Sequence, residues 1–353
     1  MVRLYGQSFG REEVLRRVGD MRQICGIDLV ELSEGKERGT RAAVFRTGSG
    51  FEFTALPDRS LDIAEASWSG TPISWTSPTG RTAPSFYDSE GLEWLRSFYG
   101  GLLVTCGLTY AGAPCEDEGE ELGLHGRVSN IPARRLCVKE GWEGDEYSMR
   151  LSGEMVEAKV FDPPLVLTRE LVARAGESKV WINDTVENRG YSTSPHMIVY
   201  HMNMGFPVVD DGSELVHRSK SVKPRDDEAE KGIDDYASFS GPQKGYEEQV
   251  FYHDMETDAG GLARVGIVNR DLEIGVKITY RKDQLPRFVE WKMMGEGTYV
   301  VGLEPSNCWV EGRDKDRERG ILEFLEPGER RSYELEFAFL HGEEALKFAD
   351  GFK

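Results

Sequence analysis

Three short segments of the 353-residue chain each hold one side chain that is suited to proton transfer. Histidine titrates near neutral pH, and burial raises the pKa of a carboxyl group towards neutrality. We therefore take His125, His201 and Glu304 as candidates for acid/base chemistry. Their segments are Leu-His-Gly-Arg at 124–127, Tyr-His-Met-Asn at 200–203 and Gly-Leu-Glu-Pro at 302–305. Because the segments are far apart in the chain, only a large sheet that brings distant strands to one cleft can unite them.

The elements that must do so have the pattern of antiparallel β structure. Short segments rich in Val, Ile, Phe, Tyr and Thr alternate with Gly, Asn, Asp and Pro turns. In 179–187, Val180, Ile182, Asp184 and Val186 share one face, which predicts a half-buried strand. The other strands that we predict are 41–45, 52–56, 166–173, 265–269, 274–280 and 333–339.

Helix signals are few. Residues 11–18 contain good helix formers and are followed by Gly19, which predicts one short N-terminal helix. The charged stretches 224–231 and 311–319 lie between strand-like segments, and we interpret both as loops. An α/β fold would need an amphipathic helix between successive strands, so the pattern favours an all-β sandwich. Large β-sandwiches exceed the usual domain length, and we expect a single domain over 1–353, with 1–30 as an N-terminal extension packed on it.

Acidic residues outnumber basic ones. The chain has 62 Asp and Glu against 43 Lys and Arg, for a formal net charge of −19, which disfavours binding to nucleic acid. The start lacks the apolar core of a signal peptide, and no apolar run approaches the length of a membrane span, so we expect a cytoplasmic protein without a membrane partner. The cysteines, 5 in number, form no CxxC pair, which indicates reduced thiols.

Several longer motifs, taken in order, resemble one family. They are Leu-Pro-Asp-Arg-Ser-Leu-Asp-Ile at 56–63, Gly-Gly-Leu-Leu-Val-Thr-Cys-Gly-Leu-Thr at 100–109, Leu-His-Gly-Arg-Val-Ser-Asn at 124–130, Tyr-His-Met-Asn-Met-Gly-Phe-Pro at 200–207, Glu-Trp-Lys-Met-Met at 290–294 and Val-Gly-Leu-Glu-Pro-Ser-Asn at 301–307. They are similar to the aldose 1-epimerase-like proteins of the DUF4432 family, within the galactose mutarotase superfamily. The resemblance implies a supersandwich of large antiparallel sheets and an isomerase that acts on a sugar or sugar acid without a cofactor.

The same resemblance implies roles for the three candidates. His125 would position the sugar, His201 would be the general acid and Glu304 the general base. The partner is then a small-molecule carbohydrate, and a homo-oligomer is compatible with the sequence. Further candidates could bind sugar hydroxyls or a carboxylate, or stack on a sugar ring. They are Asp58, Arg59, Arg127, Asn203, Arg225, His253, Trp291 and Lys292.

Each candidate also has a structural alternative, and two other functions stay open. Asp58 and Arg59 could form a turn-stabilising ion pair, and Trp291 could be a core residue. His125, His201, His253 and Glu304 could instead bind a divalent metal in a hydrolase or isomerase of a keto sugar or cyclic polyol derivative. Their spacing is not a compact metal motif. The third reading is a carbohydrate-binding protein without catalytic activity, because fold does not establish function.

Overall fold

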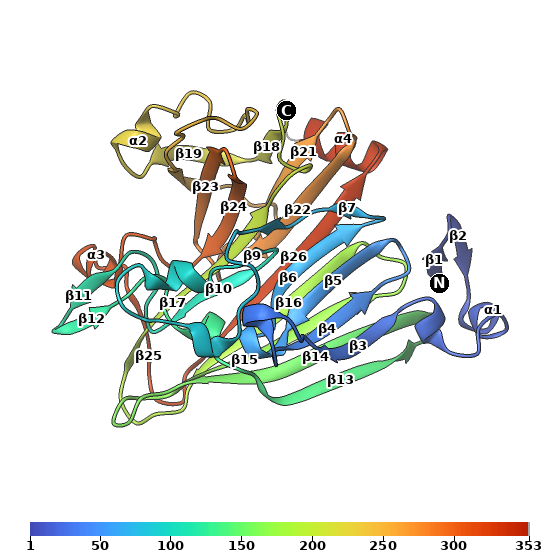
Figure 1. Cartoon of the computed structure of the whole chain (residues 1–353), viewed down its shortest axis with the longest axis horizontal. Helices are drawn as coiled ribbons and strands as arrows, with labels where there is room; N and C mark the ends of the chain where they lie inside the picture. Colours follow the sequence, from blue (N-terminus) through green and yellow to red (C-terminus); the bar gives the residue numbers. More distant parts are fainter. Residues whose placement is uncertain (352–353) are drawn as a thin grey trace.

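The computed structural model describes residues 1–351, and most of them lie in antiparallel sheets (Figure 1). Each strand predicted above falls inside an observed strand, so the prediction of an all-β fold is confirmed. The largest sheet has 8 strands and contains most of the core-facing residues of the C-terminal half. In order across the sheet these are β13 (Arg134–Glu143), β14 (Glu146–Glu157), β15 (Leu165–Arg174), β16 (Lys179–Asn188), β26 (Arg330–His341), β22 (Ile274–Arg281), β21 (Leu262–Asn269) and β18 (Glu214–His217).

Two further sheets pack on this one. The sheet of 7 strands consists of β10 (Val104–Leu108), β17 (Ser194–Met204), β24 (Thr298–Ser306), β23 (Arg287–Gly295), β20 (Gln249–Met255) and β19 (Ser219–Pro224), with β25 (Glu323–Leu325) paired to β17. The sheet of 5 strands consists of β3 (Gly26–Glu31), β4 (Arg41–Arg46), β5 (Phe51–Leu56), β6 (Asp62–Trp68) and β7 (Thr71–Pro72). Residues of all three sheets belong to one hydrophobic core, in which Phe51 of β5 stacks on Phe337 of β26.

Helices are short and lie at the periphery. They are α1 (Arg11–Leu15), α2 (Asp227–Glu230), α3 (Arg313–Glu318) and α4 (Glu343–Asp350). The predicted N-terminal helix is confirmed in a shorter form. The interpretation of 224–231 and 311–319 as loops is wrong in part, because α2 and α3 form there; the Asp226 side chain caps α2 by accepting from Ala229 N. In the described chain, no helix has the length and apolar character needed to cross a membrane.

The remaining elements are short strand pairs and 3₁₀ turns. The pairs are β1 (Val2–Leu4) with β2 (Gln7–Phe9), β8 (Trp75–Thr76) with β9 (Gly100–Gly101), and β11 (Cys115–Asp117) with β12 (Glu120–Leu122). The 3₁₀ turns are η1 (Met21–Gln23), η2 (Gly35–Glu37), η3 (Pro57–Arg59), η4 (Pro84–Phe86), η5 (Glu93–Ser97) and η6 (Val128–Asn130). Residues of β1, α1 and η1 contribute to the main core, and β3 pairs with β4, so the N-terminal segment is joined to the rest by both packing and pairing.

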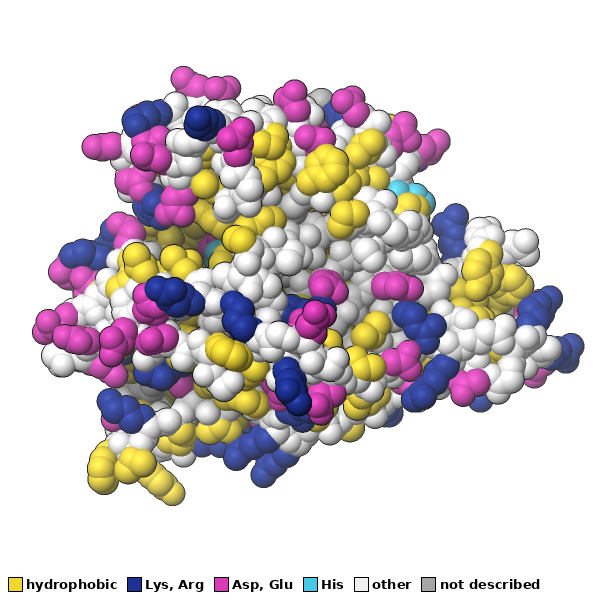
Figure 2. All heavy atoms as spheres, in the orientation of Figure 1, with side chains coloured by type: hydrophobic (Ala, Val, Ile, Leu, Met, Phe, Trp, Pro, Cys, Tyr) yellow, Lys and Arg dark blue, Asp and Glu magenta, His cyan; other side chains and the backbone are white. Residues whose placement is uncertain are grey.

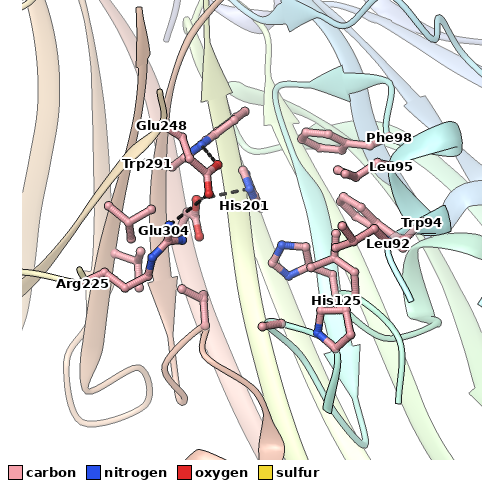
Figure 3. A pocket seen from close by; sticks show the side chains of 16 residues that line it. Leu92, Trp94, Leu95, Phe98, His125, His201, Arg225, Glu248, Trp291 and Glu304 are labelled. Atoms are coloured by element: carbon pink, nitrogen blue, oxygen red, sulfur yellow. Dashed lines mark hydrogen bonds and ion pairs between the residues drawn. The ribbon is translucent and has the colours of Figure 1, made fainter. Parts of the chain in front are cut away.

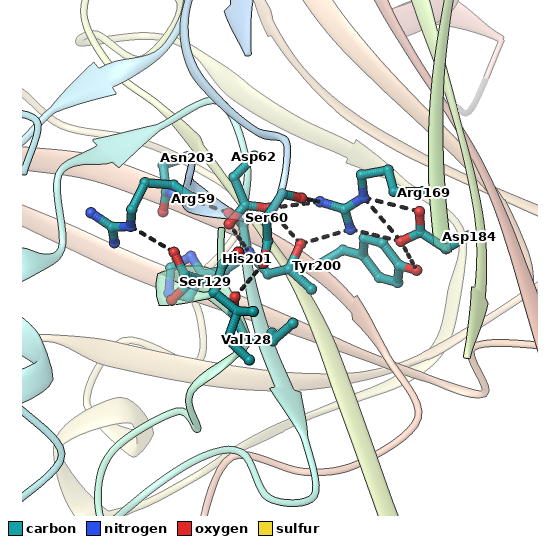
Figure 4. Close-up of polar contacts among 12 residues, drawn as sticks. Arg59, Ser60, Asp62, Val128, Ser129, Arg169, Asp184, Tyr200, His201 and Asn203 are labelled. Atoms are coloured by element: carbon teal, nitrogen blue, oxygen red, sulfur yellow. Dashed lines mark hydrogen bonds and ion pairs between the residues drawn. The ribbon is translucent and has the colours of Figure 1, made fainter. Parts of the chain in front are cut away.

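A buried arginine joins the three sheets (Figure 4). Arg169 of β15 donates to Asp184 of β16 at 2.9 Å, to Asp62 of β6 at 2.7 Å and to Thr105 of β10 at 2.8 Å. The hydroxyl of Tyr200 on β17 donates to Asp184 at 2.7 Å. This network explains how Asp184 fits on the apolar face predicted for its strand, since a buried carboxylate needs a charged, hydrogen-bonded partner.

Candidate active site

A cavity of about 420 Å³ opens on the outer face of the 7-stranded sheet and brings three distant segments together. His125, His201 and Glu304 all line it (Figure 3). Figure 2 shows the hollow from outside, with apolar side chains around it and a histidine side chain at its bottom. The cavity therefore unites the three candidates despite their separation in the sequence.

His201 and Glu304 lie side by side on neighbouring strands. Nε2 of His201 on β17 is 3.2 Å from Oε1 of Glu304 on β24. Gly302 makes this contact possible: a Cβ atom there would lie 2.8 Å from Oε1 of Glu304 and 3.2 Å from Cε1 of His201. The absent side chain thus leaves the space in which imidazole and carboxyl group meet.

His125 reaches the cavity from a tight turn rather than from a strand. Its backbone is left-handed, with φ of 58°, and Gly126 follows with φ of 77°. A Cβ at Gly126 would lie 2.3 Å from the carbonyl oxygen of Gly107, so only glycine fits. The turn is held by bonds from His125 N to Gly112 O and from Gly107 N to His125 O. The Leu-His-Gly motif therefore forms a tight turn that orients the imidazole into the cavity.

Burial keeps the three candidate acid/base groups uncharged near neutral pH. It raises the pKa of Glu304 to about 8, with a further rise from Glu248 that Arg225 opposes. Burial lowers the pKa of His201 to about 3; His125 adds to this and Asn203 opposes it. The pKa of His125 falls to about 4 for the same reason. The expectation that His201 titrates near neutrality is therefore wrong, because its imidazolium would lack water.

A polar network borders the pair. Trp291 donates from Nε1 to Oε2 of Glu248 at 2.8 Å, and Nη2 of Arg225 donates to Oε1 of the same carboxylate at 3.1 Å. Arg225 also donates to Asp226 at 2.7 Å. The indole of Trp291 stands edge-on to His201, with ring centroids 5.4 Å apart. The structure thus brings the predicted Arg225 and Trp291 to the cavity and adds Glu248, which sequence reasoning missed.

The opposite wall is apolar and aromatic, and its residues were also missed. Trp94 and Phe98 stack with ring centroids 4.7 Å apart, and both pack against the histidines. Leu92 and Leu95 complete this wall and are 58% and 47% exposed, which places them at the mouth. The spacing of Leu92, Trp94, Leu95 and Phe98 carried a signal, since apolar residues in a turn after Gly91 without a strand pattern need some cover.

The sequence of the chain matches one known protein family. The family model described as "Domain of unknown function (DUF4432)" matches residues 37–339. The chain belongs to the DUF4432 family. No curated protein matches the chain in sequence.

Solved structures share the fold of this DUF4432 protein. A Klebsiella pneumoniae protein described as a "putative aldose 1-epimerase" superposes with a TM-score of 0.88 at 24% identity, covering 92% of this chain and 86% of that one. A galactose mutarotase-like protein of Clostridium acetobutylicum gives 0.61 at 13% identity over 91% and 100% of the two chains. Galactose 1-epimerase of Lactobacillus acidophilus gives 0.58 at 11% identity over 90% and 99%. These similarities show a galactose mutarotase-like fold.

Two predicted ligand-binding residues of the DUF4432 protein lie in structural networks away from the cavity. Arg59 is fully buried and donates to the carbonyl oxygens of Ser129, Thr82 and Ser97. Asp58 does not pair with Arg59 but accepts from Nε of Arg41 at 2.9 Å. Both side chains are thereby committed to holding the loops that surround η3.

Arg127 and Asn203 flank the site without lining the cavity. Arg127 is exposed, with its guanidinium over the ring of Tyr87, 5.8 Å from the centroid. Asn203 is fully buried and donates to the carbonyl of His201 at 3.1 Å. Oδ1 of Asn203 and Nδ1 of His201 are both buried, and a side-chain hydrogen bond between the two residues raises the pKa of the imidazole. Asn203 therefore contacts His201 rather than the cavity.

Lys292 and His253 lie on the other face of the sheet. Residues that are paired directly across β23 and β24 point to the same side, so Val289 faces the cavity with Glu304, and Glu290 faces away. His253 contacts Glu290 at 3.1 Å, and Lys292 donates to the carbonyls of Asp235 and Ser238. The metal-ligand set that included His253 is therefore not assembled, and no group of three or more His, Cys, Asp or Glu in residues 1–351 is placed to hold a metal ion.

Proposed function

We propose that this protein interconverts the anomers of a neutral aldose by general acid/base catalysis at His201 and Glu304. The observation that carries the proposal is their 3.2 Å contact on the wall of a cavity. Mutarotation needs an acid at the ring oxygen and a base at the C1 hydroxyl. Both oxygens are attached to the same carbon, so the two catalysts must both reach one end of the sugar ring, which two neighbouring groups can do.

The pair holds one exchangeable proton. Near neutral pH it resides on Glu304, whose pKa is about 8, and the carboxyl group lies 3.2 Å from the uncharged Nε2 of His201. The expected roles require the proton on His201 when ring opening begins. Sugar hydroxyls that donate to the Glu304 carboxylate lower its pKa and favour this transfer across the short contact.

Ring opening then balances as follows. The Glu304 carboxylate removes the proton of the C1 hydroxyl, and the electron pair of that O–H bond forms the C=O bond of the aldehyde. The bond from C1 to the ring oxygen then breaks, and His201 protonates the ring oxygen. The pair returns to its uncharged form. Rotation about the bond between C1 and C2 presents the other face of the aldehyde, and the reverse transfers close the ring.

The walls favour an uncharged sugar. Among the cavity-lining residues the only arginine is Arg225, and its guanidinium is already paired with Glu248 and Asp226. Glu248 and Arg225 keep oxygen and nitrogen atoms available for sugar hydroxyls, while Trp291 and Phe98 lie on either side of His201 and offer ring faces (Figure 3). An acidic ligand would meet Glu248 without a free cation, so we expect calorimetry to show weaker binding of glucuronate and galacturonate than of glucose and galactose.

The test is the rate of anomer exchange, measured by NMR on a panel of neutral aldoses against uncatalysed mutarotation. Wild-type protein should accelerate exchange for at least one sugar. Glu304→Gln keeps side-chain size and His201→Asn keeps a hydrogen-bonding group, and both variants should still bind that sugar while losing on the order of 10²-fold or more of the acceleration. Unchanged exchange in Glu304→Gln with binding intact would eliminate the mechanism. Binding of a sugar without any acceleration by wild-type protein would favour a carbohydrate-binding role.

A further inference from the structure

A second, shallower groove lies beside the cavity. Its volume is about 260 Å³, and its aromatic lining consists of Trp75, Phe206 and Tyr299. Ser74 and Thr76 add hydroxyl groups, and no acidic or basic side chain lines it. Phe206 is 62% exposed, although a phenyl ring gains from being covered. The groove therefore offers ring faces and hydroxyl groups to an uncharged ligand.

Trp75 connects the groove to the cavity. Its ring meets the edge of Trp291 at a centroid distance of 6.1 Å and an angle of 73°, and it lies 5.9 Å from the ring of Phe98. Trp291 and Phe98 both line the cavity at His201. One aromatic wall thus runs from the acid/base pair to the groove, and a ligand that leaves the cavity along it reaches Trp75 next.

The groove is built from close backbone contacts. A Cβ at Gly100, where φ is +74°, would lie 2.6 Å from the ring of Trp75, and a Cβ at Gly205 would lie 3.1 Å from Cα of Trp75. The Tyr299 hydroxyl donates to Ser240 O at 2.6 Å. Trp75 and Tyr299 are thereby fixed before any ligand arrives, which lowers the ordering cost of binding.

We propose that this groove is a subsite for the second, uncharged sugar unit of a reducing saccharide whose reducing end occupies the cavity. The inference rests on the proposed function, because it places C1 of the first unit at His201 and Glu304. Alternating ring faces and hydroxyl donors suit a pyranose, which has apolar C–H faces and polar edges. The substrate class is then a short reducing oligosaccharide rather than a free monosaccharide alone.

The test compares reducing disaccharides of different linkage with their reducing-end monosaccharides by calorimetry. The probes are maltose, cellobiose, lactose, laminaribiose and isomaltose against glucose, with melibiose serving as a further 1→6 probe. At least one disaccharide should bind wild-type protein about tenfold more tightly than the monosaccharide. Phe206→Ala should remove this gain and leave monosaccharide binding unchanged. Phe161→Ala, at a 101% exposed position outside both cavities, is the matched control and should retain the gain.

A second variant controls for indirect effects of truncating the Phe206 side chain. Thr76→Trp, at an exposed position, should fill the groove and also abolish the gain. The subsite is refuted if no disaccharide binds more tightly than glucose, or if the gain survives in both groove variants. Accelerated anomer exchange without a disaccharide gain would refute the subsite alone. A gain that depends on Phe206, without accelerated exchange, would refute the catalytic proposal alone, and a protein that binds no sugar would refute both.

Discussion

Two histidine–glutamate pairs occupy the two faces of the same sheet. At the front, His201 and Glu304 are 3.2 Å apart; at the back, His253 and Glu290 are 3.1 Å apart. Burial raises the pKa of Glu304 to about 8 and also raises that of Glu290, which the Lys292 cation opposes, and it lowers the pKa of each histidine to about 3. Even the exposed fractions are close, since none of the four residues exceeds 5%.

The surroundings differ. Both front residues line the cavity, and Asn203 forms a side-chain hydrogen bond with the His201 imidazole. At the back, Nδ1 of His253 contacts the Ser219 hydroxyl, which in turn contacts His217, so the imidazole is held on both sides. A shifted pKa therefore reports burial at both pairs, and only the pair with access to a cavity is a candidate for chemistry.

The largest expected difference is in catalysis. Glu304→Gln should reduce the acceleration of anomer exchange by on the order of 10²-fold or more, because it removes the base. Glu290→Gln, the same substitution on the other face, should change it by less than about twofold. NMR exchange rates of both variants on the same sugar make the comparison. Equal losses in the two variants would show that the substitutions act through the fold.

The second largest effect on the exchange rate is expected from filling the space next to Gly302. Gly302→Ala puts a methyl group against Glu304 Oε1 and His201 Cε1 and should lower the exchange rate by about tenfold or more, since small displacements of catalytic groups are costly. A Cβ at Gly241 meets nothing within 4 Å, so Gly241→Ala is the control and should behave as wild type. Full activity in Gly302→Ala would mean that the close contact of the pair is dispensable.

The pH profile separates the two glutamates. Below the pKa of Glu304, His201 and Glu304 together hold the one proton that the mechanism needs. We therefore expect kcat/KM to stay level near neutrality and to fall above about pH 8, by about tenfold per pH unit. Glu248 raises that pKa, so Glu248→Gln should move the fall to lower pH. Glu290→Gln should leave it in place. A fall that moves only in Glu290→Gln would assign the titration to the back pair.

The smallest effect concerns stability at the back pair. The folded-state pKa of Glu290 lies above the ordinary value of 4.5 for a glutamate, so well below pH 4.5 both states are protonated and no difference arises. As pH rises towards 8, the unfolded chain ionises while the folded one does not, and stability is lost. Relative to wild type, Glu290→Gln should therefore gain more than about 1 kcal/mol between pH 5 and pH 8. Urea unfolding at both pH values measures this; a constant difference would contradict the raised pKa.

Sequence patterns predicted the strands well because each one alternates between a core face and an outer face. They could also nominate His125, His201 and Glu304, whose neighbouring glycines proved to be needed for the backbone turn at Gly126 and for side-chain space at Gly302. Alternation within one strand does not tell which face carries a cavity. His201 and His253 both lie on strands of one sheet. The sequence alone therefore could not tell which of the two histidines faces the cavity.

Other residues were unpredictable for a different reason. Glu248 lies just before β20 and reaches the site by bonding to Trp291 and Arg225, a contact that depends on how three segments pack. Arg59 is the opposite case, because it was predicted to bind a ligand and does not line the cavity. Its planar guanidinium suits a ligand but donates instead to three backbone carbonyls. A guanidinium fits both uses, and only the packing decides between them.

The acid/base pair is carried by paired strands, whereas most of the surrounding wall is carried by connecting segments. Leu92, Ala113, Pro114, His125 and Val310 lie outside the strands of the main sheets. Connecting segments tolerate insertions and substitutions that a central strand does not. Under the proposed function, descendants of one ancestral gene could therefore exchange one sugar for another by changing these segments while inheriting the proposed proton-transfer pair intact. Such divergence would leave the chemistry recognisable across relatives whose substrates have little in common.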